Sequence, residues 1–314
     1  MVDAGKTVWL CPGQGAQKVG MGKDLAARFP AARVTFQAID DALDFGLSHV
    51  MFEGPEDALT ATSNAQPAIL AHSAAIFAVL GTAVTVVAAA GHSLGEYSAY
   101  VTAGALNASD AAILVRQRGD LMQRAGRERP GAMSAVLGLT AAEVAAACHD
   151  ASAKGAIAVA ANLNTPDQTV ISGDPDAVKK AGEACKARGA KRVIELKVSG
   201  AFHSPLMAPA ANRLRVALDK APFADPKFPV IANATAEVVT TAARARRLLV
   251  DQLTGPVRWV ECVEHAGRIA GESSRFIEIG PGSTLAGFIK RILPEAKVVS
   301  VGTADQLAQF LESA

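Results

Sequence analysis

Short apolar runs of strand length alternate with amphipathic stretches along most of the chain. The runs Thr7–Cys11 and Ala83–Ala90 are rich in apolar and β-branched residues and predict two buried strands. Apolar residues recur at helical spacing over Met21–Phe29, Ala32–Leu43, Gln66–Val79, Glu96–Ala105 and Ala108–Arg124. Strands that alternate with helices in this way predict a parallel sheet flanked by helices. We therefore expect an α/β fold.

The pattern changes after residues 126–131, a linker rich in glycine, proline and charge. Strands are then expected at Met133–Gly138, Ile157–Asn162, Thr169–Ser172 and Lys191–Val198, and helices at Thr140–Ala153 and Pro175–Arg188. The order β-α-β-β-α-β is typical of a ferredoxin-like arrangement. We predict that residues 128–198 form a small ferredoxin-like domain, inserted into a large catalytic domain made of residues 1–127 and 199–314. The expected elements of its second part are Val230–Ala232, Ala243–Leu253, Arg275–Ile279 and Thr284–Leu293.

Composition and charge narrow the classes of function. The chain has 314 residues, of which 50% are hydrophobic and 19% charged, as expected for a globular protein with a sizeable core. Its formal net charge of +1 argues against broad affinity for nucleic acid, but leaves room for a local basic patch. The cysteines are far apart and form no C-x-x-C pair, so we expect reduced thiols and neither a disulfide framework nor a zinc site. They are Cys11, Cys148, Cys185 and Cys262.

The sequence carries no recognisable targeting or membrane signal. Met1–Thr7 lacks the charged and apolar regions of a signal peptide. No apolar stretch is long enough, and free enough of turn residues, to span a bilayer. We therefore expect a cytoplasmic protein without membrane contact.

The pentapeptide GHSLG at residues 91–95 is the most informative motif of the chain. It follows a predicted strand and precedes a predicted helix, which is the setting of the nucleophile elbow in α/β-hydrolase-like folds. Its glycines permit a tight turn that presents the Ser93 hydroxyl at a helix N-terminus, where free N–H groups and the helix dipole favour an oxyanion. The alternative is a glycine-lined turn with a capping serine.

A serine nucleophile needs a base, and six histidines are available. His203 lies in the segment 199–205, where the chain returns from the predicted small domain, and clefts often form at domain junctions. It is the candidate base, with a hydrogen-bonded loop histidine as the alternative. His92 adjoins Ser93 within the turn, so its ring is expected to point away from the hydroxyl. The other four histidines lie in helices or carry no motif.

Six motifs together resemble those of the malonyl-CoA:acyl-carrier-protein transacylases of fatty-acid synthesis. In chain order they are PGQGAQ at 12–17, GHSLGEYSA at 91–99, QRG at 117–119, GAFHSPLM at 200–207, QLTGPVRW at 252–259 and EIGPGSTLAG at 278–287. Each motif is weak alone, but the set occurs in the order of that family and covers nearly the whole chain. The resemblance includes the inserted ferredoxin-like domain.

This resemblance implies a ping-pong transfer through an acyl-enzyme. Ser93 would attack the thioester of malonyl-CoA while His203 takes its proton, and the phosphopantetheine thiol of acyl carrier protein would then discharge the malonyl-serine ester. Gln252 matches the residue whose backbone carbonyl orients the histidine, so no acidic third member is implied. The backbone N–H groups of Gln14 and Leu94 match the oxyanion hole of the family.

Two further residues are implied to recognise the acyl group. Arg118 would grip the free carboxylate of malonate, a task that suits the planar, always charged guanidinium. From the sequence alone, the alternative is a surface arginine beside Asp120 and Arg116. Phe202 resembles the residue of the malonyl-selective form, and its bulk would crowd a branched α-carbon.

The expected partners are malonyl-CoA and acyl carrier protein, and we expect a monomer. Neither a metal nor a cofactor is expected, because no cluster has metal-ligand spacing and coenzyme A enters only within the thioester substrate. Carrier proteins are acidic, so basic residues should line the rim of the cleft, unless they only form a solvated face. The candidates are Lys191, Arg192, Lys290 and Arg291.

Three other functions stay open at this point. A serine hydrolase would need an acidic third member and an HGG loop, and the sequence offers neither. A non-catalytic carrier-binding subunit would not need Ser93, His203 and Arg118 together. An acyltransferase that serves a polyketide synthase or a malonate decarboxylase cannot be separated from one of fatty-acid synthesis by sequence.

Overall fold

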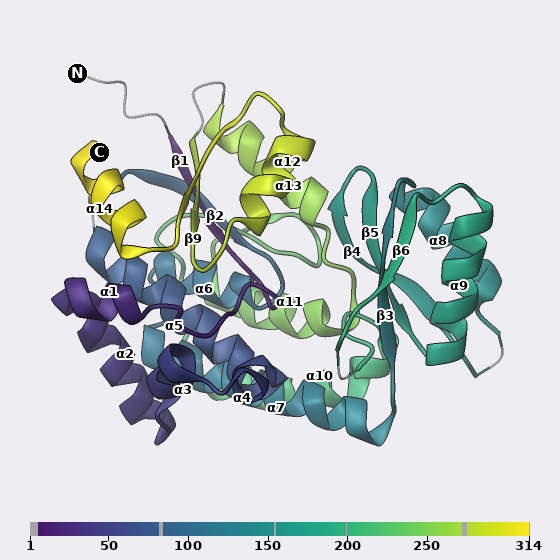
Figure 1. The fold of residues 1–314 in the computed structure, drawn as a ribbon, viewed down its shortest axis with the longest axis horizontal. Coiled ribbons are helices and arrows are strands. Elements are labelled where there is room, and N and C mark those ends of the chain that lie inside the picture. The colour runs from purple at the N-terminus through teal and green to yellow at the C-terminus, as the bar shows by residue number, and fades with distance from the viewer. Residues whose placement is uncertain (1–5, 82–83, 154, 199, 272–274, 314) are drawn as a thin grey trace.

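A computed structural model describes residues 6–81, 84–153, 155–198, 200–271 and 275–313. Two sheets organise the fold, one of six strands and one of four (Figure 1). Some sequence predictions touch residues outside the described ranges. These are the N-terminal segment before Lys6, the start of the strand predicted from Ala83, and Ser199, where the large domain was expected to resume.

The six-stranded sheet is parallel apart from one edge, as the alternation of strands and helices predicted. Its strands lie in the order β10 (Lys297–Val301), β9 (Arg275–Ile279), β1 (Thr7–Cys11), β2 (Val86–Gly91), β7 (Val230–Ile231) and β8 (Val238–Val239). Only the β7–β8 pair in this sheet is antiparallel, within the described residues. Cys11 is in register with Gly91, so the loops that follow β1 and β2 begin side by side.

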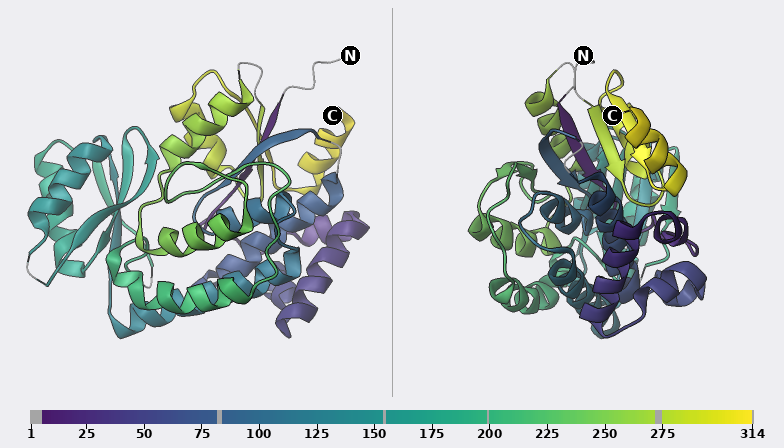
Figure 2. Two further views of the ribbon diagram at one scale, coloured as in Figure 1. Left: turned by 180° about the vertical axis from the view of Figure 1, so that it is seen from behind. Right: turned by 90° about the vertical axis from the view of Figure 1, so that its left-hand side faces the viewer.

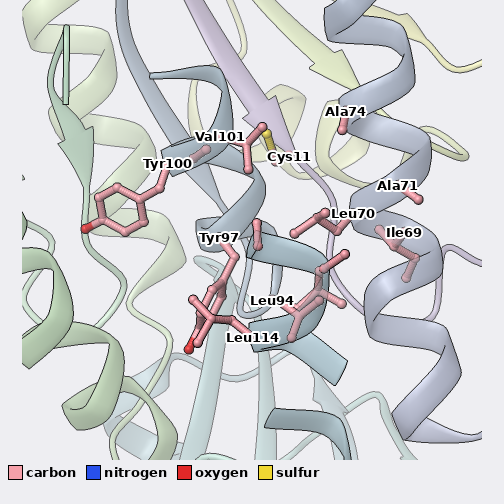
Figure 3. Close-up of a cluster of buried hydrophobic side chains, with 14 of the residues drawn as sticks. Cys11, Ile69, Leu70, Ala71, Ala74, Leu94, Tyr97, Tyr100, Val101 and Leu114 are labelled. Carbon is pink, nitrogen blue, oxygen red and sulfur yellow. The ribbon is translucent and has the colours of Figure 1, made fainter. Parts of the chain in front are cut away.

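Side chains of β1 alternate between two hydrophobic clusters, one on each face of the sheet. Trp9 and Cys11 belong to the larger cluster, and Val8 and Leu10 to the smaller. Helices α2 (Pro30–Leu43), α5 (Thr62–Leu80), α6 (Gly95–Thr102) and α7 (Ala108–Glu128) contribute to the larger cluster. Figure 3 shows Cys11 facing side chains of α5 and α6, among them Leu70. The smaller cluster is covered by α12 (Trp259–Ala270) and α13 (Thr284–Ile292).

The four-stranded sheet is antiparallel and carries its own core. Its order is β4 (Ala158–Thr165), β5 (Gln168–Gly173), β3 (Ala132–Leu137) and β6 (Arg192–Glu195). Helices α8 (Ala141–Ala151) and α9 (Pro175–Ala187) pack on one face around Val136, Val144 and Ile171. The β-α-β-β-α-β order is therefore present within residues 132–195. The domain bounds 128–198 stay a prediction.

Helix α7 is longer than the sequence analysis expected. The linker was placed at residues 126–131, but the helix continues through Glu128. Arg124 forms an ion pair with Glu128 one turn later, and Ala125 and Gly126 are buried. Gly126 is accommodated because its backbone packs against Gly200, where a Cβ would lie 3.1 Å from the Gly126 Cα.

Several elements were not predicted. They are α3 (Leu47–Glu53), α4 (Glu56–Thr60), α10 (Ala208–Lys220), α12, α14 (Ala304–Ser313), β8 and β10, whereas α1 (Lys23–Arg28) is shorter than the helix expected there and α11 (Ala242–Thr254) is close to its expected bounds. Helices α10 and α12 bury residues at helical spacing, so their signal was present and overlooked. Within the described ranges, no helix is both long and apolar enough to cross a bilayer.

The four-stranded sheet lies to one side of the six-stranded sheet (Figure 2), and β4 pairs with the segment just before α12. Leu163 on β4 donates its N–H to the Val257 carbonyl at 2.9 Å, and the Val257 N–H donates to the Ala161 carbonyl at 2.8 Å. The chain passes between the two sheets twice, at Gly131 and at Ala201, and these two segments are in contact. A Cβ on Gly131 would lie 2.4 Å from the Ala201 nitrogen. The smaller sheet is thus held beside the carboxyl ends of β1 and β2.

Candidate active site

A cleft of about 1000 Å³ opens between the two sheets. Its floor includes His92, Ser93 and the Pro12–Gln17 loop, and one wall comes from β3, β4 and β5. Another part of its lining comes from the first turns of α13, through Thr284, Leu285 and Phe288. The carboxyl ends of parallel strands commonly form such sites, because loops from several strands meet there.

Ser93 lies in a strained turn between β2 and α6. Its φ angle is +54°, which is uncommon for a residue with a side chain. Close backbone approach requires both flanking glycines: a Cβ on Gly91 would lie 1.9 Å from the Gly95 carbonyl oxygen, and one on Gly95 would lie 2.1 Å from that of Cys11. The strand–turn–helix setting predicted for the pentapeptide is therefore present.

His203 and Ser93 are brought together although they are 110 residues apart. The Ser93 Oγ lies 2.7 Å from His203 Nε2, and His203 Nδ1 lies 2.9 Å from the backbone carbonyl of Gln252. A carbonyl only accepts hydrogen bonds, so the proton of the neutral ring is on Nδ1 and Nε2 is the acceptor. In this tautomer the Ser93 hydroxyl donates to Nε2. The Gln252 carbonyl thus stands where the sequence resemblance placed it.

The environment of His203 keeps its ring neutral. Burial, which is the larger cause, and the positive charge of Arg118 together lower the pKa of His203 to about 3. The hydrogen bond to the Gln252 carbonyl acts against these two effects. At neutral pH the ring is therefore a free base that can accept a proton.

Arg118 is buried, with 1% of its surface exposed, and points at the nucleophile. Its Nη2 donates to Ser93 Oγ at 3.1 Å and to Gln252 Oε1 at 3.0 Å, and its Nη1 donates to Gln66 Oε1 at 2.7 Å. The guanidinium also lies 5.8 Å from the centre of the Tyr97 ring. Its Nε is buried without a hydrogen-bond partner in the part of the chain that the structure describes.

Arg118 is therefore not a surface arginine, in contrast to Arg116 on the same helix. Arg116 lies 3.9 Å from Asp120 and is partly exposed. Arg118 forms no ion pair with a carboxylate among the described residues. A buried cation without a carboxylate is costly, and a negative group bound beside Ser93 would offset that cost.

The two backbone N–H groups expected in the oxyanion hole are available. Within the described ranges, neither the Gln14 nor the Leu94 N–H donates a backbone or side-chain hydrogen bond. Gln14 lines the cleft with Ser93, and its side chain reaches Thr62 at 3.4 Å. Leu94 follows the nucleophile immediately before α6, and its side chain is buried against Leu70 and Tyr97 in the core (Figure 3).

The remaining candidates differ in position. Phe202 lies in the wall of the cleft and is 5% exposed, so its ring is near the reacting groups, as expected. Arg291 is exposed but forms an ion pair with Asp167 at the end of β4 and β5, with Nε 3.1 Å from Oδ1. Lys197 lines the cleft and was overlooked. Lys191, Arg192 and Lys290 are exposed and do not line the cleft.

The sequence analysis did not identify Asn233, whose side chain forms hydrogen bonds with the turn that contains Ser93. Its Oδ1 accepts the Ser93 N–H at 2.7 Å, and its Nδ2 donates to the Gly91 carbonyl at 2.8 Å. Asn233 lies two residues after β7 and directly follows the predicted strand Val230–Ala232, and this position was the available signal, because residues after parallel strands meet at one sheet edge. Glu96 was quoted only as part of a motif, yet it is fully buried and accepts the Asn233 backbone N–H at 2.9 Å.

His92 turns away from the nucleophile, as the sequence predicted. Its Nε2 lies 2.8 Å from Asn164 Oδ1 on β4, and its ring packs edge-on against Trp259. The Gly280–Gly282 turn is likewise no phosphate loop, because Glu278 already accepts the N–H groups of Leu285 and Ala286 at the start of α13. Among the described residues, no group of His, Cys, Asp and Glu could hold a metal ion.

Comparison with known proteins places the chain in a family. The acyl transferase domain family matches residues 8–309. The malonyl CoA-acyl carrier protein transacylase of Bacillus subtilis is 43% identical over 309 residues, covering 98% of this chain and 97% of the relative. The Escherichia coli K12 protein of the same name is 42% identical over 308 residues, covering 97% of this chain and 98% of the relative.

Solved structures of similar proteins superpose on nearly the whole length of this chain. An acyl carrier protein S-malonyltransferase from Vibrio cholerae superposes with a TM-score of 0.92 at 41% identity, covering 97% of this chain and 99% of the other. A malonyl-transacylase in complex with a type II polyketide synthase acyl carrier protein superposes with a TM-score of 0.94, also at 41% identity, covering 98% and 100%. From its sequence, fold and length, this chain is an acyltransferase and belongs to the malonyl CoA-acyl carrier protein transacylases.

Proposed function

We propose that this chain transfers the malonyl group of malonyl-CoA to the phosphopantetheine thiol of acyl carrier protein in fatty-acid synthesis. Family membership supports the reaction class, and a similar malonyl-transacylase forms a complex with an acyl carrier protein. The observation that carries the proposal is the position of Ser93 Oγ, 2.7 Å from His203 Nε2 and 3.1 Å from Arg118 Nη2. Nucleophile, base and a carboxylate-binding cation meet at one oxygen.

In the first half-reaction, Ser93 Oγ attacks the thioester carbonyl carbon of malonyl-CoA. His203 Nε2 takes the hydroxyl proton as the new C–O bond forms. The oxyanion of the tetrahedral intermediate accepts hydrogen bonds from the Gln14 and Leu94 N–H groups. The C–S bond then breaks, coenzyme A leaves with the proton from His203, and a malonyl ester remains on Ser93.

In the second half-reaction the same groups work in reverse. The carrier thiol gives its proton to His203 Nε2 and attacks the ester carbonyl carbon. The intermediate collapses with cleavage of the C–O bond, and Ser93 recovers its proton from His203. The backbone carbonyl of Gln252 orients the ring in both steps, in place of a carboxylate.

Arg118 gives the site its preference for a malonyl group. Its guanidinium is desolvated, and a carboxylate is the ligand that best compensates a buried guanidinium through paired hydrogen bonds. Phe202 adds a steric limit beside the acyl group. The proposed reaction uses only side chains and backbone groups of this chain, with coenzyme A entering as the thioester substrate, and we place it in a monomer of the cytoplasm.

Labelling with isotopic malonyl-CoA, followed by peptide mass spectrometry, tests the proposal. The label should appear on the Ser93 peptide and disappear in Ser93→Ala, with circular dichroism unchanged. Ser98→Ala removes a buried hydroxyl from the adjoining helix and should leave the label in place. A label that persists in Ser93→Ala, or that maps to a cysteine, would refute the mechanism.

The fate of the ester distinguishes transfer from hydrolysis. Carrier protein or coenzyme A should discharge it rapidly, whereas it should outlast many turnovers in buffer, because no acidic group beside His203 positions a water molecule. Mass spectrometry of the acylated protein, with and without carrier, measures both rates. Rapid loss in buffer alone would identify a serine hydrolase instead.

A further inference from the structure

Glu96 is a fully buried carboxylate directly beneath the nucleophile turn. Its Oε2 accepts the backbone N–H of Asn233 at 2.9 Å and the side-chain Nε2 of Gln252 at 2.8 Å. It lies in the first turn of α6, three residues after Ser93. The proposed mechanism gives this carboxylate no step, although burying a charged carboxylate is costly unless it is paired and hydrogen-bonded.

The side chain of Gln252 connects Glu96 to Arg118. Its Oε1 accepts from Arg118 Nη2 at 3.0 Å, while its Nε2 donates to Glu96 Oε2. A guanidinium offers only donors and a carboxylate only acceptors, so these two partners fix which end of the amide faces which way. The same nitrogen also donates to the Ser93 carbonyl at 2.9 Å.

The Gln252 side chain connects two groups of opposite charge, Arg118 and Glu96. Arg118 is buried without a carboxylate in hydrogen-bond contact among the described residues, and Glu96 stands one amide away from it. Burial raises the pKa of Glu96 to about 7, and its hydrogen bonds and the charge of Arg118 act against that rise. The other titratable groups that interact with Glu96 are Tyr97 and Tyr100 on its own helix and Cys262 on α12.

We propose that Glu96 is a positioning residue for acyl-group recognition. Its carboxylate orients the Gln252 amide, and the amide holds the Arg118 guanidinium beside Ser93. The proposal rests on the proposed function, because it assigns Arg118 to the malonyl carboxylate. Without Glu96 the amide can turn its NH₂ towards the guanidinium, and two donors facing each other would push Arg118 away from the position that it occupies here.

Two substitutions separate positioning from simple support of the fold. Glu96→Gln keeps an oxygen that can accept both hydrogen bonds but removes the charge and the fixed acceptor geometry. Glu96→Ala removes both bonds. Ser98→Ala is the matched control, since Ser98 is buried on the same helix and its Oγ has no hydrogen-bond partner in the described part of the chain.

The decisive measurement is kcat/KM for malonyl-CoA and for acetyl-CoA in a double-mutant cycle with Arg118→Ala. Glu96→Gln should lower the value for malonyl-CoA by about 10-fold and that for acetyl-CoA by less than about 3-fold, because residues in one network couple. In the Arg118→Ala background the same change should cost less than about 2-fold. Ser98→Ala should leave the malonyl-to-acetyl ratio unchanged.

Other outcomes overturn the proposal in recognisable ways. Equal losses for both acyl groups, or the same loss with and without Arg118, would mean that Glu96 supports the turn alone. A Glu96→Gln protein that does not fold would assign the carboxylate to the fold. A wild-type protein that transfers no malonyl group would instead refute the proposed function, and that value is measured first.

Discussion

Replacing Arg118 with alanine removes the buried cation that touches the nucleophile, and its effect depends on the acyl group. A malonyl group carries the carboxylate that the guanidinium would bind, whereas an acetyl group of similar shape does not. We expect malonyl transfer to fall steeply and acetyl transfer to fall little. The ratio of the two kcat/KM values is therefore the quantity to follow.

The structure sets the size of the effect. Arg118 is 1% exposed, so its contact with a carboxylate is desolvated, and losing one partner of such a pair costs about 2–5 kcal/mol. At 1.4 kcal/mol per factor of ten, kcat/KM for malonyl-CoA should fall by roughly 30-fold to 4000-fold. The change also leaves the amide oxygens of Gln66 and Gln252 unpaired, at about 1–3 kcal/mol of stability each.

The assay compares purified wild-type protein, Arg118→Ala and Arg116→Ala. Arg116 lies on the same helix but is partly exposed and paired with Asp120, so its variant should keep the wild-type ratio. Thermal melting separates loss of fold from loss of recognition. An equal fall for malonyl-CoA and acetyl-CoA in a folded Arg118→Ala protein would refute the reasoning, because Arg118 would then serve the structure alone.

The acid side of the pH profile and the turn glycines give further predictions. Because the pKa of His203 is lowered to about 3, the ring is neutral above that pH, and kcat/KM for acetyl-CoA, which does not use the carboxylate contact of Arg118, should change by less than about 3-fold from pH 8 to about pH 5. A steep fall in kcat/KM with an apparent pKa near 6.5 in the wild type would contradict this. Arg118→Ala removes a positive charge beside His203, so it should raise the pKa of His203 and move the fall in kcat/KM to higher pH. Gly95→Ala should cost about 1–3 kcal/mol in a thermal or denaturant melt and slow acylation, because its Cβ would lie 2.1 Å from the Cys11 carbonyl oxygen. Gly287→Ala, with no atom within 4 Å of its Cβ, is the control, and an unchanged Gly95→Ala would contradict the prediction.

The sequence predicted those parts of the site that follow directly from local chain geometry. A glycine-flanked serine between a strand and a helix can form little else than an exposed turn, and β1 and β2 were visible as apolar runs. The candidate residues Ser93, His203 and Arg118 then came from motifs. Their contacts depend on tertiary packing that no local pattern encodes.

The network beneath the turn was not predicted for the same reason. Gln66 comes from α5 and Asn233 from the segment after β7, and only the folded sheet brings them near Ser93 and Glu96. A buried glutamate looks like any surface glutamate in a sequence, because burial is decided by what packs over it. Strand β10 was missed although its sequence, KVVSV, has three valines in five residues and is as apolar as that of β9, so its signal was present and overlooked.

The contact between Gly131 and Ala201 bears on two properties of the protein, the proton transfer at Ser93 and the shape of the cleft wall. This contact brings the two ends of the segment 132–195 together two residues before His203, so we expect the approach of His203 to Ser93 to tolerate changes elsewhere in that segment. Substitutions in that insert can therefore reshape the wall of the cleft, and with it the range of acyl carriers admitted, while the proton transfer stays the same. We therefore expect related proteins to keep the catalytic residues while the cleft wall varies.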